Sequence, residues 1–118
     1  MPVRIANVTF DCEDPLTVAR FWSAALERPL DPNPTRFFAS IGLTEENRDG
    51  APNLFFICVP EKKTAKNRTH LDLDSGGDRE KEIARLVELG AERGADHDEW
   101  GKSWTVMTDP EGNEFCIA

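Results

Sequence analysis

The sequence has no tyrosine, two histidines, and three cysteines that lie far apart without a C-x-x-C pair. This spacing favours reduced thiols over a disulfide scaffold. No apolar run approaches the roughly 20 residues that a membrane-spanning helix needs. Residues 1–10 contain no continuous apolar stretch of the kind found in a secretory signal. We therefore expect a cytoplasmic protein that does not enter a membrane.

Positive charge is also scarce. Lysine and arginine number 14 against 22 aspartates and glutamates, which gives a formal net charge of −8. Such an acidic chain has no general attraction to phosphate backbones, so nucleic acid is not an expected partner. A Walker loop, a G-x-G-x-x-G fingerprint, an H-E-x-x-H helix and a G-x-S-x-G elbow are all missing. The chain therefore lacks the sequence signatures of the commonest nucleotide-binding proteins and hydrolases.

What the chain does contain is an internal repeat. Residues 7–11 align with residues 70–74, and residues 18–22 align with residues 83–87. A module of about 60 residues would hide its apolar faces poorly alone, so two similar modules are expected to pack together. The sequence thus predicts a single domain over residues 1–118, with modules at about 4–60 and 67–118. The basic stretch 62–68 joins them.

Each module is predicted to begin with a strand and a helix. Apolar and polar residues alternate in both opening strands, so one face of each strand is apolar. Asp14 and Asp78 are the predicted N-caps, and Pro29 and Gly90 the predicted stops. The apolar stripes predicted to face the core are Val18, Phe21, Trp22, Ala25 and Leu26 in the first helix, and Ile83, Leu86 and Val87 in the second.

Shorter strands are predicted after each helix, at 36–41, 54–59, 104–108 and 114–118. The turn formers at 109–113 indicate a hairpin loop, and residues 45–51 are predicted to form a mobile loop. The resulting order is β-α-β-β-β, twice. The sequence therefore predicts an α+β fold built from two βαβββ modules.

His70 is the main candidate for chemistry, because it is predicted to lie mid-strand on a polar face. Glu114 and Cys116 alternate with Phe115 and Ile117, so they are predicted to share the face of His70. Histidine, glutamate and cysteine can each ligate zinc or another divalent ion. The alternatives stay open: a hydrogen-bonded histidine, a solvated carboxylate and a small buried thiol.

Three further features have two interpretations each. His97 lies among acidic residues and could be a site residue or part of an exposed loop, and the loop is predicted. Trp100 and Trp104 flank a glycine turn, and they could form the wall of a small-molecule pocket or pack in the core. The basic stretch 62–68 could dock an anionic group or be a solvated linker.

The residues also resemble a known superfamily. The strand at 8–11 before Asp14 and Pro15, together with the closing D-P-E-G-N turn at 109–113, resembles the vicinal oxygen chelate superfamily of glyoxalases, bleomycin-resistance proteins and extradiol dioxygenases. Segments 59–62, 66–73 and 109–116 are similar to a glyoxalase-like subgroup common in actinobacteria. The resemblance implies a curved mixed sheet that encloses a cup-shaped pocket, with helices on the outer face. It also implies a homodimer.

Metal-using members of the superfamily hold a divalent ion with about four protein ligands, so the resemblance implies candidate positions here. His70 matches a ligand histidine, whereas Asn7 stands where the other histidine is found. Cys116 stands at the position of the last-strand glutamate, with Glu114 two residues earlier. The candidate ligands are therefore His70, Glu114 and Cys116. On the last strand of the first module, where the resemblance implies another ligand, the residues are Phe55, Phe56 and Ile57, and none of them can ligate a metal. We therefore expect the four-ligand site to be incomplete. The expected cofactor is either a divalent metal or none.

Three functional hypotheses follow. The first is a small-molecule-binding protein with no full metal site, whose pocket is lined by Asn7, Thr9, His70, Asp72, Trp104 and Glu114. The second is an enzyme of the lyase, isomerase or dioxygenase type, in which His70 and Glu114 are acid and base or metal ligands. The third is a resistance protein that sequesters an antibiotic. The residues by themselves do not identify the ligand.

Overall fold

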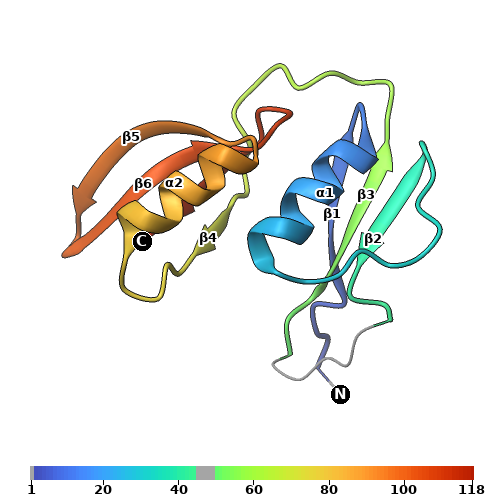
Figure 1. Cartoon of the computed structure of the whole chain (residues 1–118), viewed down its shortest axis with the longest axis horizontal. Helices are drawn as coiled ribbons and strands as arrows, with labels where there is room; N and C mark the ends of the chain where they lie inside the picture. The colour runs from blue at the N-terminus through green and yellow to red at the C-terminus, as the bar shows by residue number, and fades with distance from the viewer. Residues whose placement is uncertain (1, 45–49) are drawn as a thin grey trace. The chain divides into compact units, whose positions relative to one another are not determined.

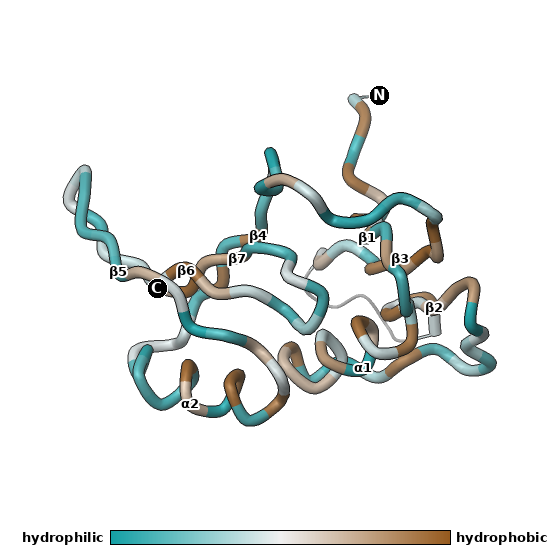
Figure 2. The backbone as a smooth tube through the Cα atoms, turned by 90° about the horizontal axis from the view of Figure 1, so that it is seen from above, coloured by the Kyte–Doolittle hydropathy of each residue, from teal (hydrophilic) through white to brown (hydrophobic). Residues whose placement is uncertain are grey.

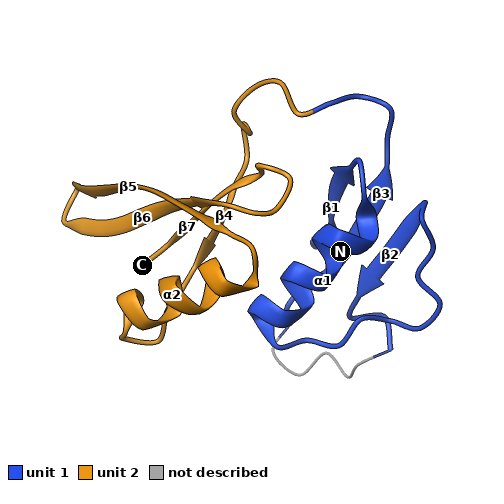
Figure 3. Cartoon of the chain, turned by 45° about the horizontal axis from the view of Figure 1, so that its top comes forward, with its two compact units in different colours: residues 1–62 blue, residues 63–118 orange. Residues whose placement is uncertain are grey.

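The structure is a computed structural model that describes residues 2–44 and 50–118 (Figure 1). The chain divides into two compact units, unit 1 at Met1–Lys62 and unit 2 at Lys63–Ala118 (Figure 3). The division falls inside the basic stretch 62–68 that the sequence analysis placed between the modules. Residues 45–49 of the predicted mobile loop lie outside the described residues.

Unit 1 is a three-stranded sheet with one helix against it. Its elements are β1 (Asn7–Cys12), α1 (Pro15–Leu26), β2 (Phe38–Ile41) and β3 (Asn53–Cys58). The strand order is β1-β3-β2, with β1 parallel and β2 antiparallel to β3. The strands predicted at 36–41 and 54–59 correspond to β2 and β3. An isolated bridge also pairs Leu30 with Ile41.

Unit 2 repeats this plan with a fuller sheet. Its elements are β4 (Leu71–Leu73), α2 (Arg79–Leu89), β5 (Glu92–Glu99), β6 (Lys102–Thr108) and β7 (Glu114–Ile117). The strand order is β4-β7-β6-β5, in which only the pair of β4 and β7 is parallel. The α+β class, with two βαβββ-type modules and two mixed sheets, is confirmed. Within the described residues, no helix is long and apolar enough to cross a membrane.

Both helices begin at the predicted caps. The Asp14 carboxylate accepts hydrogen bonds from the Thr17 amide and hydroxyl, and Asp78 accepts one from the Lys81 amide. Gly90 ends α2 with a φ of 122°, in the left-handed region that glycine adopts without strain. The polar residues at these positions thus satisfy amide groups that the helix backbone leaves open.

The predicted apolar stripes form most of the two cores. Val18, Phe21, Trp22 and Ala25 of α1 are buried, and Figure 2 shows brown segments along this helix. In α2 the residues Ile83 and Leu86 are buried, but Val87 is 45% exposed, so its predicted place in the core was wrong. The narrower stripe of α2 covers a sheet that adds Met107, Phe115 and Ile117 to the core of unit 2.

Strand β5 is the element that the sequence analysis missed. All eight of its residues are exposed, so it has no apolar alternation to detect. The strand forms because it pairs with β6 across a two-residue turn, Trp100 and Gly101. Arg93 also joins it to α2 by donating two hydrogen bonds to Glu80, at 2.7 and 3.0 Å.

Candidate functional site

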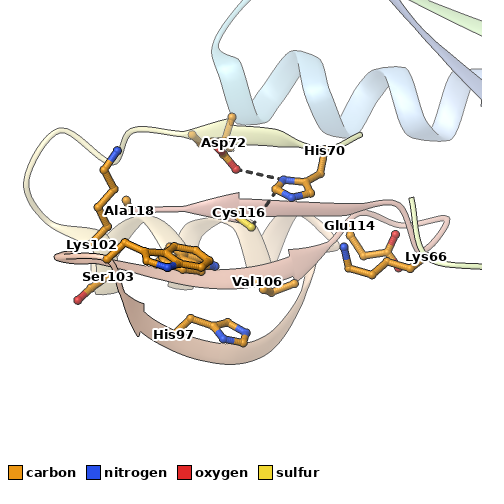
Figure 4. Close-up of a pocket in the computed structure, with 13 residues that line it drawn as sticks. Lys66, His70, Asp72, His97, Lys102, Ser103, Val106, Glu114, Cys116 and Ala118 are labelled. Carbon is orange, nitrogen blue, oxygen red and sulfur yellow. Dashed lines mark hydrogen bonds and ion pairs between the residues drawn. The ribbon is translucent and has the colours of Figure 1, made fainter. Parts of the chain in front are cut away.

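The sheet of unit 2 brings the candidate residues of β7 onto one face. Phe115 and Ile117 are buried in the core, so the alternating residues Glu114 and Cys116 point to the opposite, open face. Cys116 is in register with Asp72 on β4 and with Val106 on β6. These three residues form one row across the open face, as Figure 4 shows.

A polar cluster of three side chains lies at the β4 end of this row. The Nδ1 atom of His70 lies 3.1 Å from an Asp72 carboxylate oxygen and 3.9 Å from the Cys116 sulfur. One donor atom from each of the three side chains can be chosen so that all lie within 4.8 Å of one another. The predicted mid-strand position of His70 was wrong, because His70 directly precedes β4.

The Cys116 thiol is the most buried member of this polar cluster, with 7% of its surface exposed. Burial raises the pKa of this thiol, and the neighbouring Asp72 carboxylate raises it further, while Lys66 lowers it. The protein therefore favours the neutral thiol, which can donate a hydrogen bond, over the thiolate.

Glu114 belongs to the same face but has different partners. Its carboxylate accepts a hydrogen bond from the Asn67 amide at 2.9 Å and forms an ion pair with Lys63 at 3.1 Å. Burial raises the pKa of Glu114, but these two interactions lower it more, so it lies below the ordinary value. The carboxylate is thus held in its charged form by residues 63–67 and lies outside the polar cluster.

Stacked aromatic rings form the β6 side of the site. The ring of Trp104 is stacked with His97, 5.4 Å between centroids, and with Trp100, 5.9 Å between centroids. His97 is exposed as predicted, but the predicted loop was wrong, because His97 lies in β5 and is in register with Trp104. The sequence could have placed His97 only through the strand pairing, since the residues of β5 carry no apolar pattern.

The polar cluster and the aromatic rings line one pocket of about 590 Å³. We refer to it as the unit 2 pocket, because all of its lining residues belong to unit 2. Its size is in the range of small-molecule sites. Besides the aromatic rings and the polar cluster, it is lined by Lys66, Leu73, Lys102, Ser103, Val106, Glu114 and Ala118.

The other predicted site residues lie in unit 1. Asn7 and Thr9 are on β1, where the Asn7 amide donates a hydrogen bond to the Thr9 hydroxyl at 3.2 Å. Phe55, Phe56 and Ile57 are on β3. Their side chains offer no metal-ligating atom, as the sequence analysis noted. None of these residues lines the unit 2 pocket.

The basic stretch 62–68 has mixed roles. Lys62 forms an ion pair with Glu13 at 2.6 Å, and Lys63 forms one with Glu114. Lys66 lines the unit 2 pocket. The stretch is therefore partly engaged in ion pairs and partly a wall of the pocket.

The polar cluster has the donor chemistry of a divalent-metal site. A histidine nitrogen, a carboxylate oxygen and a thiol sulfur are all zinc ligands, and catalytic zinc sites use three protein ligands with one open position. The side chains of His70, Asp72 and Cys116 are close enough to share one ion. Such a set differs from the predicted one, since Asp72 takes the place of Glu114.

The comparisons with known proteins agree with the fold. The family described as "Glyoxalase-like domain" matches residues 7–118. A glyoxalase/bleomycin resistance protein/dioxygenase family enzyme from Burkholderia phytofirmans PsJN is 16% identical, with a TM-score of 0.74, and the match covers 95% of this chain and 94% of that one. A search of the curated proteins found no match.

Two further solved structures show the same fold. A possible glyoxalase from Bacillus cereus is 16% identical, with a TM-score of 0.71 and coverage of 98% of both chains. A mutant of the fosfomycin resistance protein FosX from Listeria monocytogenes, complexed with Mn(II) and dihydroxypropylphosphonic acid, is 10% identical. Its TM-score is 0.76, and the match covers 99% of this chain and 90% of that one. At these identities the likeness extends to the fold alone.

Proposed function

Because the chain belongs to the glyoxalase-like domain family, we propose that it binds a small organic molecule in the unit 2 pocket. The observation that carries this proposal is the convergence of the polar cluster and the stacked aromatic rings on one pocket. Apolar walls with a few placed polar groups are typical of small-molecule sites. The Cys116 thiol and the His70 imidazole are positioned to exchange hydrogen bonds with oxygen atoms of a ligand.

An NMR screen tests this proposal. A library of oxygen-bearing fragments would be added to the ¹⁵N-labelled protein, and backbone and indole N–H shifts recorded. We expect binding fragments to shift the signals of Cys116, Val106 and Trp104, which line the pocket, and to leave the signal of Lys81 on α2 unchanged. A library in which no fragment shifts the pocket signals would overturn the proposal.

A second candidate function is a divalent-metal-dependent lyase, isomerase or dioxygenase, and the polar cluster favours it. A divalent ion bound there would polarise an oxygen atom of the substrate. His70, Asp72 and Cys116 would hold the ion, and Glu114 would keep its ion pair with Lys63 at the side of the site.

Metal analysis tests this second candidate. After dialysis against Zn²⁺ and removal of free ions, we expect about one zinc per chain by elemental analysis, and little in His70→Ala and Cys116→Ala. Glu114→Gln is the matched control and should keep its zinc, because Glu114 lies outside the polar cluster. Wild-type protein without zinc would exclude this candidate. If the wild-type protein binds zinc, turnover of the methylglyoxal–glutathione adduct would test the lyase reaction itself.

We also propose three finer assignments. The resemblance of segments 59–62, 66–73 and 109–116 supports membership of the actinobacterial glyoxalase-like subgroup and a homodimer. The three widely spaced cysteines support a location in the cytoplasm. The family model supports the broader assignment over residues 7–118.

A further inference from the structure

The tip of the β5–β6 hairpin carries a tryptophan in an unfavourable backbone conformation. Trp100 and Gly101 connect the strands, and both have positive φ angles, 53° and 73°. Two-residue turns with positive φ at both positions strongly prefer asparagine or glycine at the first. A bulky residue there is an outlier, and such strain is concentrated at functional sites.

Folding of the hairpin does not account for this tryptophan. The side chain of Trp100 is 84% exposed, so it contributes little to a core. Its ring is nearly parallel to that of Trp104, with 11° between the planes. The strained turn thus presents a flat aromatic surface at the mouth of the unit 2 pocket, where a second flat ring could stack.

Two lysines of the same pocket supply unpaired positive charge. Lys66 and Lys102 line the pocket near its opposite ends (Figure 4). Among the described residues, neither ammonium group has a hydrogen bond or ion pair. Lys63, by contrast, is paired with Glu114. The pocket also contains two carboxylates, but Glu114 is paired with Lys63 and Asp72 lies beside His70. The two lysines are thus left to attract an anionic group of a ligand.

We infer that the unit 2 pocket takes a flat aromatic molecule that carries an anionic group, such as an aromatic carboxylate. The ring stacks on the face of Trp100 that is turned away from Trp104, and Lys66 or Lys102 pairs with the anion. This inference rests on the proposed function and narrows it to one class of ligand.

Calorimetry with three matched probes tests the inference. The probes are 2-naphthoate, the neutral 2-naphthylmethanol, and cyclohexanecarboxylate, which keeps the charge but lacks the aromatic ring. We expect 2-naphthoate to bind about tenfold more tightly than either of the others. A tenfold difference corresponds to about 1.4 kcal/mol, which one aromatic or charge-assisted contact can contribute.

Variants assign the two contacts. Trp100→Asn suits the turn, so it keeps the hairpin folded while it removes the ring. It should weaken 2-naphthoate about tenfold and leave cyclohexanecarboxylate unchanged. The double change Lys66→Gln with Lys102→Gln should abolish the preference for 2-naphthoate over the alcohol. Lys81→Gln, an exposed lysine of α2 outside the pocket, is the control and should change nothing.

Equal binding of the three probes would overturn the inference. The inference would also fail if Lys81→Gln weakened 2-naphthoate as much as the double change Lys66→Gln with Lys102→Gln. If other fragments shift the pocket signals by NMR while 2-naphthoate does not bind, the inference fails and the proposed function stands. If no compound binds in the pocket, both fail.

Discussion

At the scale of single residues, Asp31 shows how this chain uses a buried carboxylate for structure. It is almost fully buried and accepts hydrogen bonds from the Ser40 hydroxyl, the Leu43 amide, and the amide and hydroxyl of Thr44. Burial raises the pKa of Asp31, but these hydrogen bonds lower it more, so the pKa lies below its ordinary value. The charged carboxylate therefore stabilises the folded state.

We predict that Asp31→Asn destabilises the protein by about 2 kcal/mol at pH 7, because an amide cannot accept all four hydrogen bonds. The folded-state pKa is lowered, so this stability is present above the unfolded pKa of about 4 and is lost as the pH falls through the folded pKa. Urea unfolding at pH 7 and pH 3 measures both effects, and the difference from wild type should shrink at pH 3. Asp11→Asn, at an exposed carboxylate of the same unit, should have little effect at either pH. A constant difference would contradict the role of the charge.

The residues of the site show what a residue pattern can reveal. The alternation of β7 correctly placed Glu114 and Cys116 on one face, because side chains alternate strictly along a strand. It could not show that Asn67 and Lys63 hold Glu114, or that Asp72 lies beside Cys116. Those contacts depend on which strands are neighbours and in which register.

At the scale of elements, the β5–β6 hairpin is the part of the fold that the sequence pattern hid. Helices α1 and α2 could be predicted because capping residues and apolar stripes are local signals. Strand β5 has only exposed residues, and Figure 2 shows the outer part of the hairpin as mostly hydrophilic. Its pairing with β6 also contains a register shift between Arg93 and Asp96. No local pattern marks such a strand.

We predict that Trp100→Asn raises the free energy of unfolding by about 0.5 kcal/mol. Relief of the left-handed backbone strain contributes about 1–2 kcal/mol, and the lost stacking on Trp104 offsets about 1 kcal/mol of it. Trp100→Ala removes the same ring but keeps the strained conformation, so it should destabilise the protein. Urea unfolding of the two variants separates the terms. Equal stabilities would show that the turn stores no strain.

At the scale of the whole molecule, the prediction concerns assembly. The resemblance to two-module glyoxalase-like proteins leads us to expect a homodimer. Light scattering after gel filtration should therefore give twice the chain mass of 13.2 kDa. A mass of 13.2 kDa across the micromolar range would contradict this expectation.

The net charge of −8 leads us to expect no shift of DNA in a gel at physiological salt.

The sequence by itself determined the α+β class, the two modules, the starts of both helices, the end of α2 and the face on which Glu114 and Cys116 lie. It did so because hydrophobic period, capping and turn residues are local properties. Only the tertiary structure decided that His70, Asp72 and Cys116 form one polar cluster, and that His97 and Trp100 stack on Trp104. The physical reason is that strand order and register bring together residues far apart in the chain, and neither is contained in a local pattern.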